Sequence, residues 1–253
     1  MRGRMDLSEV RASSGQRHPW ETARAEAIER ILRARAIAPD SVLDVGCGDG
    51  FTGEHLVKTL GARTLWGVDV YLTPEDCEAR SRASARYVRE LSQVTEHDFE
   101  LALLCDVIEH VEDDKALVAS ILSRLAPTGH LLITVPSFQA LFSSHDRALK
   151  HYRRYSLPEL RSAVELSGGE LLADGYLFGS LLPVRLLQKA KESLLPPSEA
   201  EAEFGVGGWS APALVTKALH TAFRLDNGVM LALNAAHIKA PGLSAWALCK
   251  KRT

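Results

Sequence analysis

A short apolar run that opens directly into a glycine turn constrains this chain more than any other segment. Residues 42–53 read Val-Leu-Asp-Val-Gly-Cys-Gly-Asp-Gly-Phe-Thr-Gly, with Asp44 inside the run and glycines at 46, 48 and 50 after it. Glycine tolerates positive φ and lets the backbone approach a ligand closely. A strand that passes through such a turn into a helix is typical of a nucleotide-type cofactor site at the carboxyl edge of a parallel sheet.

The charge of Asp44 distinguishes between two classes of cofactor. The glycines at 48, 50 and 53 also fit the dinucleotide fingerprint. In a dinucleotide site the loop amides face a pyrophosphate, which a carboxylate just before the glycines would repel. A carboxylate suits a cofactor that is cationic at this point, with an ammonium and a sulfonium, which describes S-adenosylmethionine (SAM). An NAD-linked oxidoreductase is the rival interpretation, and the chain lacks a recognisable catalytic lysine–tyrosine pair for it.

Further segments, taken in order, resemble the class I SAM-dependent methyltransferases. Residues 43–50 have the form of that family's first motif, and residues 67–70 resemble its second strand, with Asp69 where a ribose-binding acid is usual. Residues 101–111 resemble its fourth strand with a D-x-x-E-H-V exit, and residues 129–136 resemble its fifth. A subgroup that modifies small molecules is similar in the H-Y-R-R-Y segment at residues 151–155.

The resemblance and the alternation of strands with helices predict one fold class. We expect an α/β, Rossmann-like, doubly wound and mostly parallel seven-stranded sheet, with helices on both faces and a helical insertion before the last strand. We expect the strands at 41–45, 64–70, 86–88, 101–105, 130–135, 170–177 and near 243–250, with a turn at 127–129.

The predicted organisation has four parts: a disordered leader (1–17), a SAM-binding core (18–177), a variable helical lid or substrate-binding insertion (178–240) and a final strand (241–253). The insertion is apolar at both ends, so added core helices or a dimer interface are the alternative. A homodimer is therefore left open.

Composition excludes several classes of function. The net charge is −2, and no stretch concentrates lysine and arginine with aromatics, so nucleic acid is not the expected partner. The four cysteines have no zinc-binding spacing. Neither a secretory segment nor an apolar run of membrane-spanning length is present, so we expect a cytoplasmic location and no transmembrane segment.

The resemblance implies SAM as cofactor and S-adenosylhomocysteine as product. Asp44 is expected to orient the methionine end, Asp69 to accept from the ribose hydroxyls, and Glu90 and Leu91 to lie beside the adenine. The full set of expected cofactor contacts is Asp44, Gly46, Cys47, Gly48, Gly50, Asp69, Val70, Glu90, Leu91, Cys105, Asp106 and His110.

Residues near the ends of the fourth and fifth strands are candidates for catalysis. His145 and His151 are candidate bases without a preference, and Asp106 could steer the methyl group. The alternative is that the neighbouring arginines pair with Asp146 or Glu159 and fix a helix start. The expected acceptor contacts are Trp20, Arg24, His145, Tyr152 and Arg154.

The D-x-x-E-H segment also permits a metal. Its spacing would place Asp106, Glu109 and His110 on one helical face, with a remote histidine, His145 or His151, as a further ligand. Many relatives keep Glu-His there without metal, and no metal is expected.

The expected function is methyl transfer from SAM to oxygen or nitrogen of a small, partly apolar metabolite, in specialised (natural product) biosynthesis. Carbon methylation and a lipid or isoprenoid acceptor are alternatives. A non-catalytic SAM-binding interaction subunit is the rival from another class.

Overall fold

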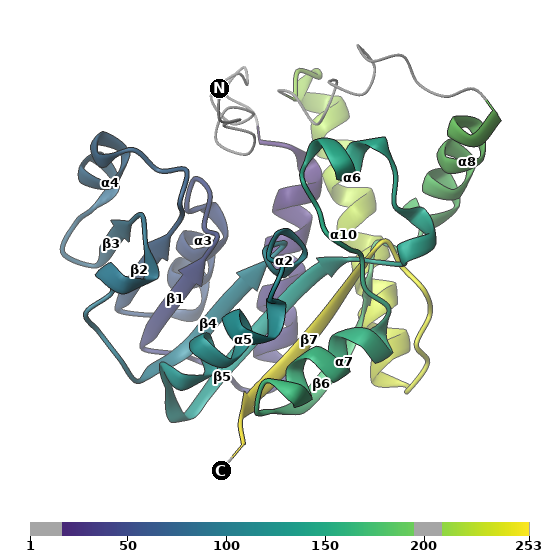
Figure 1. The fold of residues 1–253 in the computed structure, drawn as a ribbon. Helices are drawn as coiled ribbons and strands as arrows, with labels where there is room; N and C mark the ends of the chain where they lie inside the picture. The colour runs from purple at the N-terminus through teal and green to yellow at the C-terminus, as the bar shows by residue number, and fades with distance from the viewer. Residues whose placement is uncertain (1–16, 195–208, 253) are drawn as a thin grey trace.

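Seven strands form one sheet in the computed structural model, which describes residues 17–194 and 209–252 (Figure 1). The leader expected over residues 1–17 therefore lies, except for Arg17, outside the described residues. The strand order is β3-β2-β1-β4-β5-β7-β6. The strands are β1 (Ser41–Val45), β2 (Thr64–Val68), β3 (Ala85–Val88), β4 (Phe99–Cys105), β5 (Leu125–Pro136), β6 (Gly169–Leu177) and β7 (Ser244–Lys251).

Helices follow most of the strands. The α-helices are α2 (Pro19–Arg33), α3 (Phe51–Leu60), α4 (Pro74–Arg80), α5 (Asp114–Ser123), α6 (Ser144–Ala148), α7 (Leu157–Leu166), α8 (Leu181–Leu194) and α10 (Ala213–Ala235). Three short 3-10 turns are η1 (Leu91–Gln93), η2 (Ile108–His110) and η3 (Gln139–Leu141).

The pairing of the strands confirms the expected fold class. The strands from β3 to β5 pair in parallel, and only β7 runs antiparallel, between β5 and β6. Parallel strands joined by helices place helices on both faces of the sheet. The carboxyl ends of the parallel strands therefore meet at one edge, and α6, α8 and the first turns of α2 and α10 gather there (Figure 1).

Alternation along β4 divides the core into two layers. Leu101 and Leu103 pack with α2 and α3 on one face, whereas Ala102 and Leu104 pack with α5 and α7 on the other. All four side chains are fully buried. Residues 101–105 of this central strand are buried and apolar at every position, as expected for a strand that is covered on both faces.

The turn expected at residues 127–129 is an excursion within β5. The pairing with β4 jumps from Phe99 opposite Leu125 to Leu101 opposite His130. The residues between project out of the ladder as a bulge, because proline at 127 has no N–H to donate.

The insertion expected to be a lid has two helices within the described residues, and they have different roles. α10 packs along α2 and β6 and so behaves as an added core helix. Asn227 anchors it: its Oδ1 accepts from the Phe178 amide at 2.9 Å, and its Nδ2 donates to the Ala23 carbonyl at 3.3 Å. α8 instead stands over the carboxyl edge of the sheet (Figure 1).

A helix that crosses a lipid bilayer needs about 20 consecutive, mostly apolar residues. Within residues 17–194 and 209–252, no helix is both long enough and apolar enough to span a membrane.

Replacing Asn227 tests whether α10 is part of the core. Asn227 is 1% exposed, so Asn227→Ala leaves the Phe178 amide buried without its acceptor. We expect the free energy of unfolding to fall by about 1–3 kcal/mol, measured by urea denaturation. Thr221→Ala, at an exposed position of the same helix, is the matched control and should change it by less than about 0.5 kcal/mol. Equal effects of the two substitutions would show that α10 is only loosely attached.

Candidate active site

A cavity of about 780 Å³ opens at the carboxyl edge of the parallel strands. Strand ends supply its floor, while α2, α6 and α8 supply its walls. Thirteen of the residues expected from the sequence line it: Trp20, Arg24, Asp44, Gly46, Cys47, Gly48, Asp69, Cys105, Asp106, His110, His145, His151 and Arg154.

The glycine turn after β1 has the backbone that its sequence demands. Gly46 and Gly50 have φ of +72° and +84°, a region that a Cβ disfavours. A Cβ on Gly46 would overlap the side chain of Val107. The amides of Gly46 and Cys47 donate to the Val68 carbonyl at 2.8 and 3.1 Å, which fixes the turn against the end of β2.

Asp69 is held rigidly beside this turn. Its Oδ2 accepts from the Gly48 amide at 2.8 Å, and its Oδ1 accepts from the Tyr71 amide at 2.9 Å. The residue is 8% exposed and lines the cavity. A carboxylate oriented by two amides retains further lone pairs for ligand hydroxyls.

Asp44 is buried beneath the glycine turn and is not an exposed charge. It is 1% exposed, and its Oδ2 accepts from the Gly53 amide in the first turn of α3 at 3.0 Å. Burial raises its pKa to about 7, against the opposing effects of the Gly53 hydrogen bond and Arg24; the nearby Asp69 and Asp49 raise it further. The carboxyl group therefore helps to fix the loop and is only partly ionised at neutral pH.

The first helix covers the cavity through Arg24. Its guanidinium forms an ion pair with Asp106 and lies 4.4 Å from the ring centroid of Trp20. Asp106 has φ of +56° and is held there by Thr134, whose Oγ1 donates to it at 3.2 Å. A non-glycine residue in this conformation needs support from its surroundings, and such residues cluster at functional sites.

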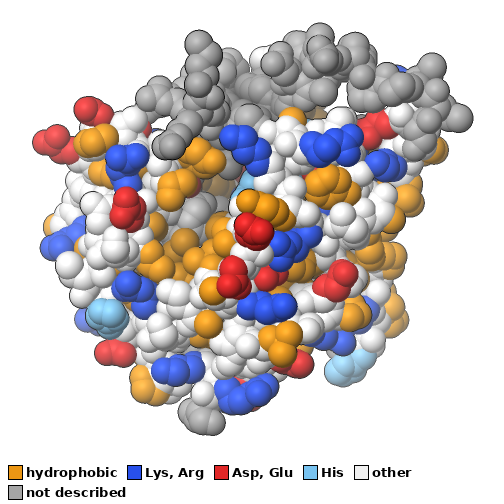
Figure 2. All heavy atoms as spheres, viewed as in Figure 1, with side chains coloured by type: hydrophobic (Ala, Val, Ile, Leu, Met, Phe, Trp, Pro, Cys, Tyr) orange, Lys and Arg blue, Asp and Glu red, His pale blue; other side chains and the backbone are white. Residues whose placement is uncertain are grey.

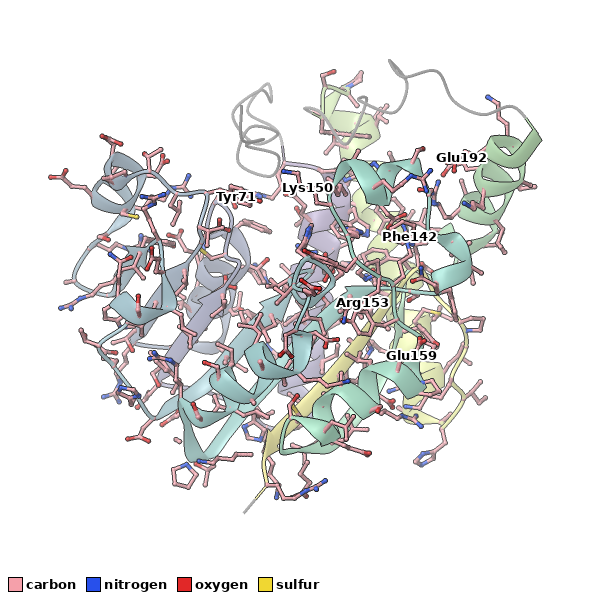
Figure 3. The ribbon with its side chains drawn as sticks, in the orientation of Figure 1. Tyr71, Phe142, Lys150, Arg153, Glu159 and Glu192 are labelled. Atoms are coloured by element: carbon pink, nitrogen blue, oxygen red, sulfur yellow. The ribbon has the colours of Figure 1, made fainter. Side chains whose placement is uncertain are left out.

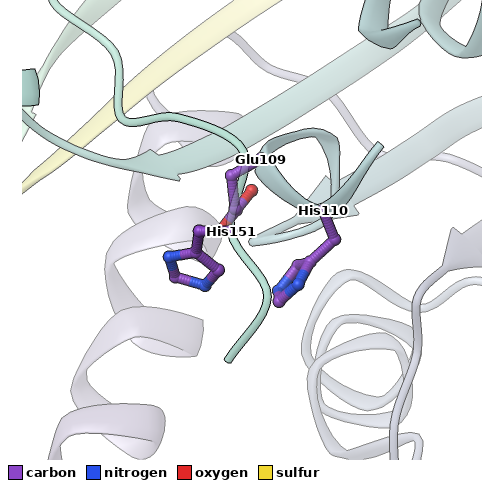
Figure 4. A group of neighbouring side chains, drawn as sticks. All are labelled: Glu109, His110 and His151. Carbon is purple, nitrogen blue, oxygen red and sulfur yellow. The ribbon is translucent and has the colours of Figure 1, made fainter. Parts of the chain in front are cut away.

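The expected helical face of Asp106, Glu109 and His110 is wrong. Asp106 precedes the 3-10 turn η2 and has a left-handed backbone, so the three do not share one helical face. The structure instead brings together Glu109, His110 and His151, whose ligand atoms lie within 4.8 Å of one another (Figure 4). The rings of His110 and His151 meet edge to face, with centroids 4.5 Å apart. The donor set is one that divalent metals accept, and it lies at the cavity wall.

A buried carboxylate organises the segment after β5. Asp146 is fully buried, and its Oδ1 meets His151 Nδ1 at 2.9 Å and Arg154 Nε at 2.7 Å. Burial by itself would raise the pKa of Asp146, but these two hydrogen bonds hold it well below its usual range. The alternative that an arginine pairs with Asp146 is therefore correct, whereas Glu159 caps α7 through Ser156.

His145, the other candidate base, also lines the cavity. Burial lowers its pKa, and the positive charges of Arg185 and Arg154 lower it further, against the opposing effect of Asp146. Its imidazole is therefore neutral at pH 7 and able to accept a proton. Cys105 is not a comparable nucleophile, because burial raises the pKa of its thiol to about 12.

Comparison with known proteins decides the family. A model of the methyltransferase domain matches residues 19–173, which is more than half of the chain. The chain belongs to the methyltransferase domain family. The resemblance seen in the glycine turn is thereby confirmed at the level of the family.

Two curated relatives of the methyltransferase domain match about half of the chain. A ubiquinone biosynthesis O-methyltransferase of Hahella chejuensis is 27% identical over 143 residues, covering 49% of this chain and 59% of its own length. A norajmaline N-methyltransferase of Rauvolfia serpentina is 27% identical over 154 residues, covering 51% and 52%. The chain thus spans about half the length of the curated relatives it matches.

A solved structure shares the fold. The phospholethanolamine N-methyltransferase 2 of Haemonchus contortus, in complex with phosphomonomethylethanolamine and S-adenosylhomocysteine, superposes with a TM-score of 0.54. Its sequence is 16% identical, and the match covers 90% of this chain and 52% of that one.

The cofactor of this methyltransferase domain is SAM, and the residues present fit it. Asp44, Asp49 and Asp69 all line the glycine-turn end of the cavity. This donor set suits a ligand with an ammonium, a sulfonium and ribose hydroxyls, and it opposes a pyrophosphate.

Five expected contacts lie away from the described cavity lining: Gly50, Val70, Glu90, Leu91 and Tyr152. The side chain of Val70 is 63% exposed, and that of Tyr152 is 54% exposed. Glu90 caps η1, while Leu91 packs against the core. Gly50, Val70 and Tyr152 lie next to cavity residues in sequence, whereas Glu90 and Leu91 do not.

The contribution of α8 to the cavity was not predicted from the sequence. Arg185, Gln188 and Glu192 line the cavity together with Lys191. Their spacing of three and four residues places them on one helical face, a signal that was present in the sequence. Other lining residues that were not expected are Arg17, Asp49 and Phe51.

The raised pKa of Asp44 predicts a pH-dependent cost to stability. Between an unfolded pKa of 3.8 and a folded pKa of about 7, the unfolded chain loses this proton first, so wild-type stability falls as the pH rises through this range. Asp44→Asn keeps an acceptor for the Gly53 amide and removes the loss. We compare the free energy of unfolding of this variant with that of the wild type, measured by urea denaturation. The difference should shift in favour of the variant by about 2–4 kcal/mol from pH 4 to pH 8.

The control is Asp40→Asn, at an exposed carboxylate. It makes the same substitution away from the loop and shows how stability responds to the loss of an exposed carboxylate. A difference for Asp44→Asn that does not change with pH would mean that the buried carboxyl group is ionised throughout.

Proposed function

We propose that this protein transfers a methyl group from SAM to an oxygen or nitrogen atom of a small, partly apolar acceptor. The observation that carries the proposal is that the Asp146–His151 pair and the glycine turn line or support the same cavity. Specialised metabolism is the expected setting. The named activities of the curated relatives include both O- and N-methylation, which agrees with leaving the acceptor atom open.

Asp69 and the glycine turn are the proposed cofactor-binding elements. The Asp69 carboxylate is oriented by two amides and would accept from the ribose hydroxyls. Asp44 and Asp49 lie at the same end and suit the ammonium group. When bound, SAM supplies a methyl group on a sulfonium, which is already activated for displacement.

The chain's own task is then to align the acceptor and exclude water. Arg24 and Trp20 close the cavity on the side of α2. A hydroxyl acceptor also has to lose a proton, which needs a positioned base.

His151 is the proposed base. Asp146 accepts from its Nδ1, and this bond fixes the tautomer that leaves Nε2 as the proton acceptor. Its side chain is 8% exposed, so the ring is held in place by its surroundings. His145, whose pKa is lowered by burial, is the second candidate.

A non-catalytic SAM-binding subunit is the rival function. It would need the glycine turn and Asp69 but would have no use for an imidazole oriented by a buried carboxylate. Methyl transfer from labelled SAM into a panel of phenols and amines separates the two functions, because a subunit without activity binds SAM and labels none of them.

Replacing Asp69 tests the cofactor site. Asp69→Ala removes the acceptor for the ribose hydroxyls and loosens the Gly48 amide. We expect SAM and S-adenosylhomocysteine to bind more weakly by about 1–3 kcal/mol, measured by isothermal titration calorimetry. Glu165→Ala, at an exposed carboxylate of α7 outside the cavity, is the control and should leave the affinity unchanged. Unchanged affinity in Asp69→Ala would remove this residue from the site.

Replacing His151 and its partner tests the proposed base. His151→Ala should lower kcat for a hydroxyl acceptor by about 100-fold or more and leave the Kd for SAM unchanged, because the imidazole acts on the acceptor. Asp146→Asn should also lower kcat. It should shift the pH profile of kcat as well, because the substitution changes the tautomer of His151. His97→Ala, at an exposed histidine, is the control. Wild-type turnover in both His151→Ala and His145→Ala would mean that positioning alone drives the reaction.

A further inference from the structure

The two ends of the cavity differ in charge. Asp44, Asp49 and Asp69 lie at the glycine-turn end, where Arg17 pairs with Asp49. At the other end, the lining side chains of α8 and of the segment after β5 include three cations, Arg154, Arg185 and Lys191, and one carboxylate, Glu192. The buried Asp146 pairs with Arg154 from behind, and within the described residues no carboxylate pairs with Lys191. The α8 end is therefore positive overall.

α8 turns its charged face inward and its apolar face outward. Val184, Leu186 and Leu187 are 49%, 52% and 73% exposed, and hydrophobic side chains mark the edge of the molecule where α8 lies (Figure 2). The reverse arrangement is usual for a helix at a protein surface. Polar contacts hold α8 in place: Lys189 donates to the Phe142 carbonyl at 2.5 Å, and Glu192 lies on the side of the helix that faces this loop (Figure 3).

Arg185 is already oriented to bind an oxyanion. Its Nη1 donates to a carboxylate oxygen of Glu192 at 3.1 Å, and its Nη2 donates to the Ser143 hydroxyl. Its side chain is 13% exposed, so little of its freedom is left to lose on binding. A guanidinium fixed in this way favours carboxylate and phosphate groups, with which it forms charge-assisted hydrogen bonds.

His145 lies among these charges. Its pKa is lowered mainly by burial, and Arg185, His151 and Arg154 lower it further. The nearby carboxylate of Asp146 opposes this effect and raises the pKa.

We propose that the methyl acceptor carries an anionic group, a carboxylate or a phosphate, that Arg185 and Lys191 of α8 bind at the end of the cavity away from the glycine turn. This inference rests on the proposed methyl transfer, because it assigns a chemical class to the acceptor. The anionic group anchors the acceptor at α8, and the atom to be methylated extends from there toward His151 and the cofactor end. Glu192 competes with this group for Arg185.

Binding of matched small probes tests the proposal. The protein loaded with S-adenosylhomocysteine is titrated with benzoate, phenyl phosphate and the neutral benzyl alcohol by isothermal titration calorimetry. We expect at least one anion to bind at least about tenfold more tightly than the alcohol. The tighter anion distinguishes a carboxylate acceptor from a phosphate acceptor.

Three substitutions on α8 locate the site. Arg185→Gln and Lys191→Gln should each weaken binding of the preferred anion by about fivefold or more, whereas Glu192→Gln should strengthen it, because the competing carboxylate is gone. Lys58→Gln, on the exposed face of α3, removes one positive charge elsewhere and should have no effect. The thermal unfolding midpoint of each variant shows that it is folded, and Lys191→Gln provides a second test if Arg185→Gln is unstable.

The inference fails if the alcohol binds as well as the anions, if no anion binds at millimolar concentration, or if the variants leave anion affinity unchanged. The affinity for S-adenosylhomocysteine separates this failure from that of the proposed function. Tight cofactor binding and methyl transfer without anion preference would overturn the anionic acceptor alone. Absent cofactor binding would overturn the proposed function.

Discussion

Two main-chain hydrogen bonds, from Gly46 and Cys47 to the carbonyl of Val68, hold the turn after β1 against the end of β2. They can form because β1 and β2 run parallel and finish at the same edge. This contact places Asp69, the residue after β2, where its carboxylate accepts from the Gly48 amide. Left-handed φ at the three glycines is the condition for all of it, and a Cβ on Gly46 or Gly50 would also overlap Val107 or Tyr87. One local backbone geometry thus supports both the loop and the acid beside it.

The residues that depend on local pattern were predictable, and those that depend on distant packing were not. The glycine turn, Asp69 and the sheet could be predicted because strand periodicity and turn chemistry are local. Asp106 was placed on a helical face from its spacing, yet Arg24 and Thr134 hold it in a left-handed conformation. Val70 and Tyr152 adjoin site residues in sequence and point away, because register and turn geometry decide direction. Arg185 lines the cavity because the insertion places α8 beside it, and the sequence alone does not show where the insertion packs.

Electrostatics give the cavity a direction. Carboxylates gather at one end because the ends of β1 and β2 and the loop before α3 converge there, and burial raises the pKa of Asp44. In the cavity wall between the two ends, the carboxylate of Asp146 pairs with His151 and Arg154. Opposed charge along a cavity orients a polar ligand during its approach and not only after contact. Two helices from separate parts of the chain, α2 and α8, complete the enclosure.

The position of β7 has a consequence for biosynthesis. This strand follows the other described strands in sequence, yet it lies inside the sheet between β5 and β6 and pairs with both. β7 therefore has to be synthesised before β6 can join the sheet, because β6 pairs with β7. Until then β5 has an open edge and β6 has no neighbour, a state in which nascent chains associate with one another or with chaperones.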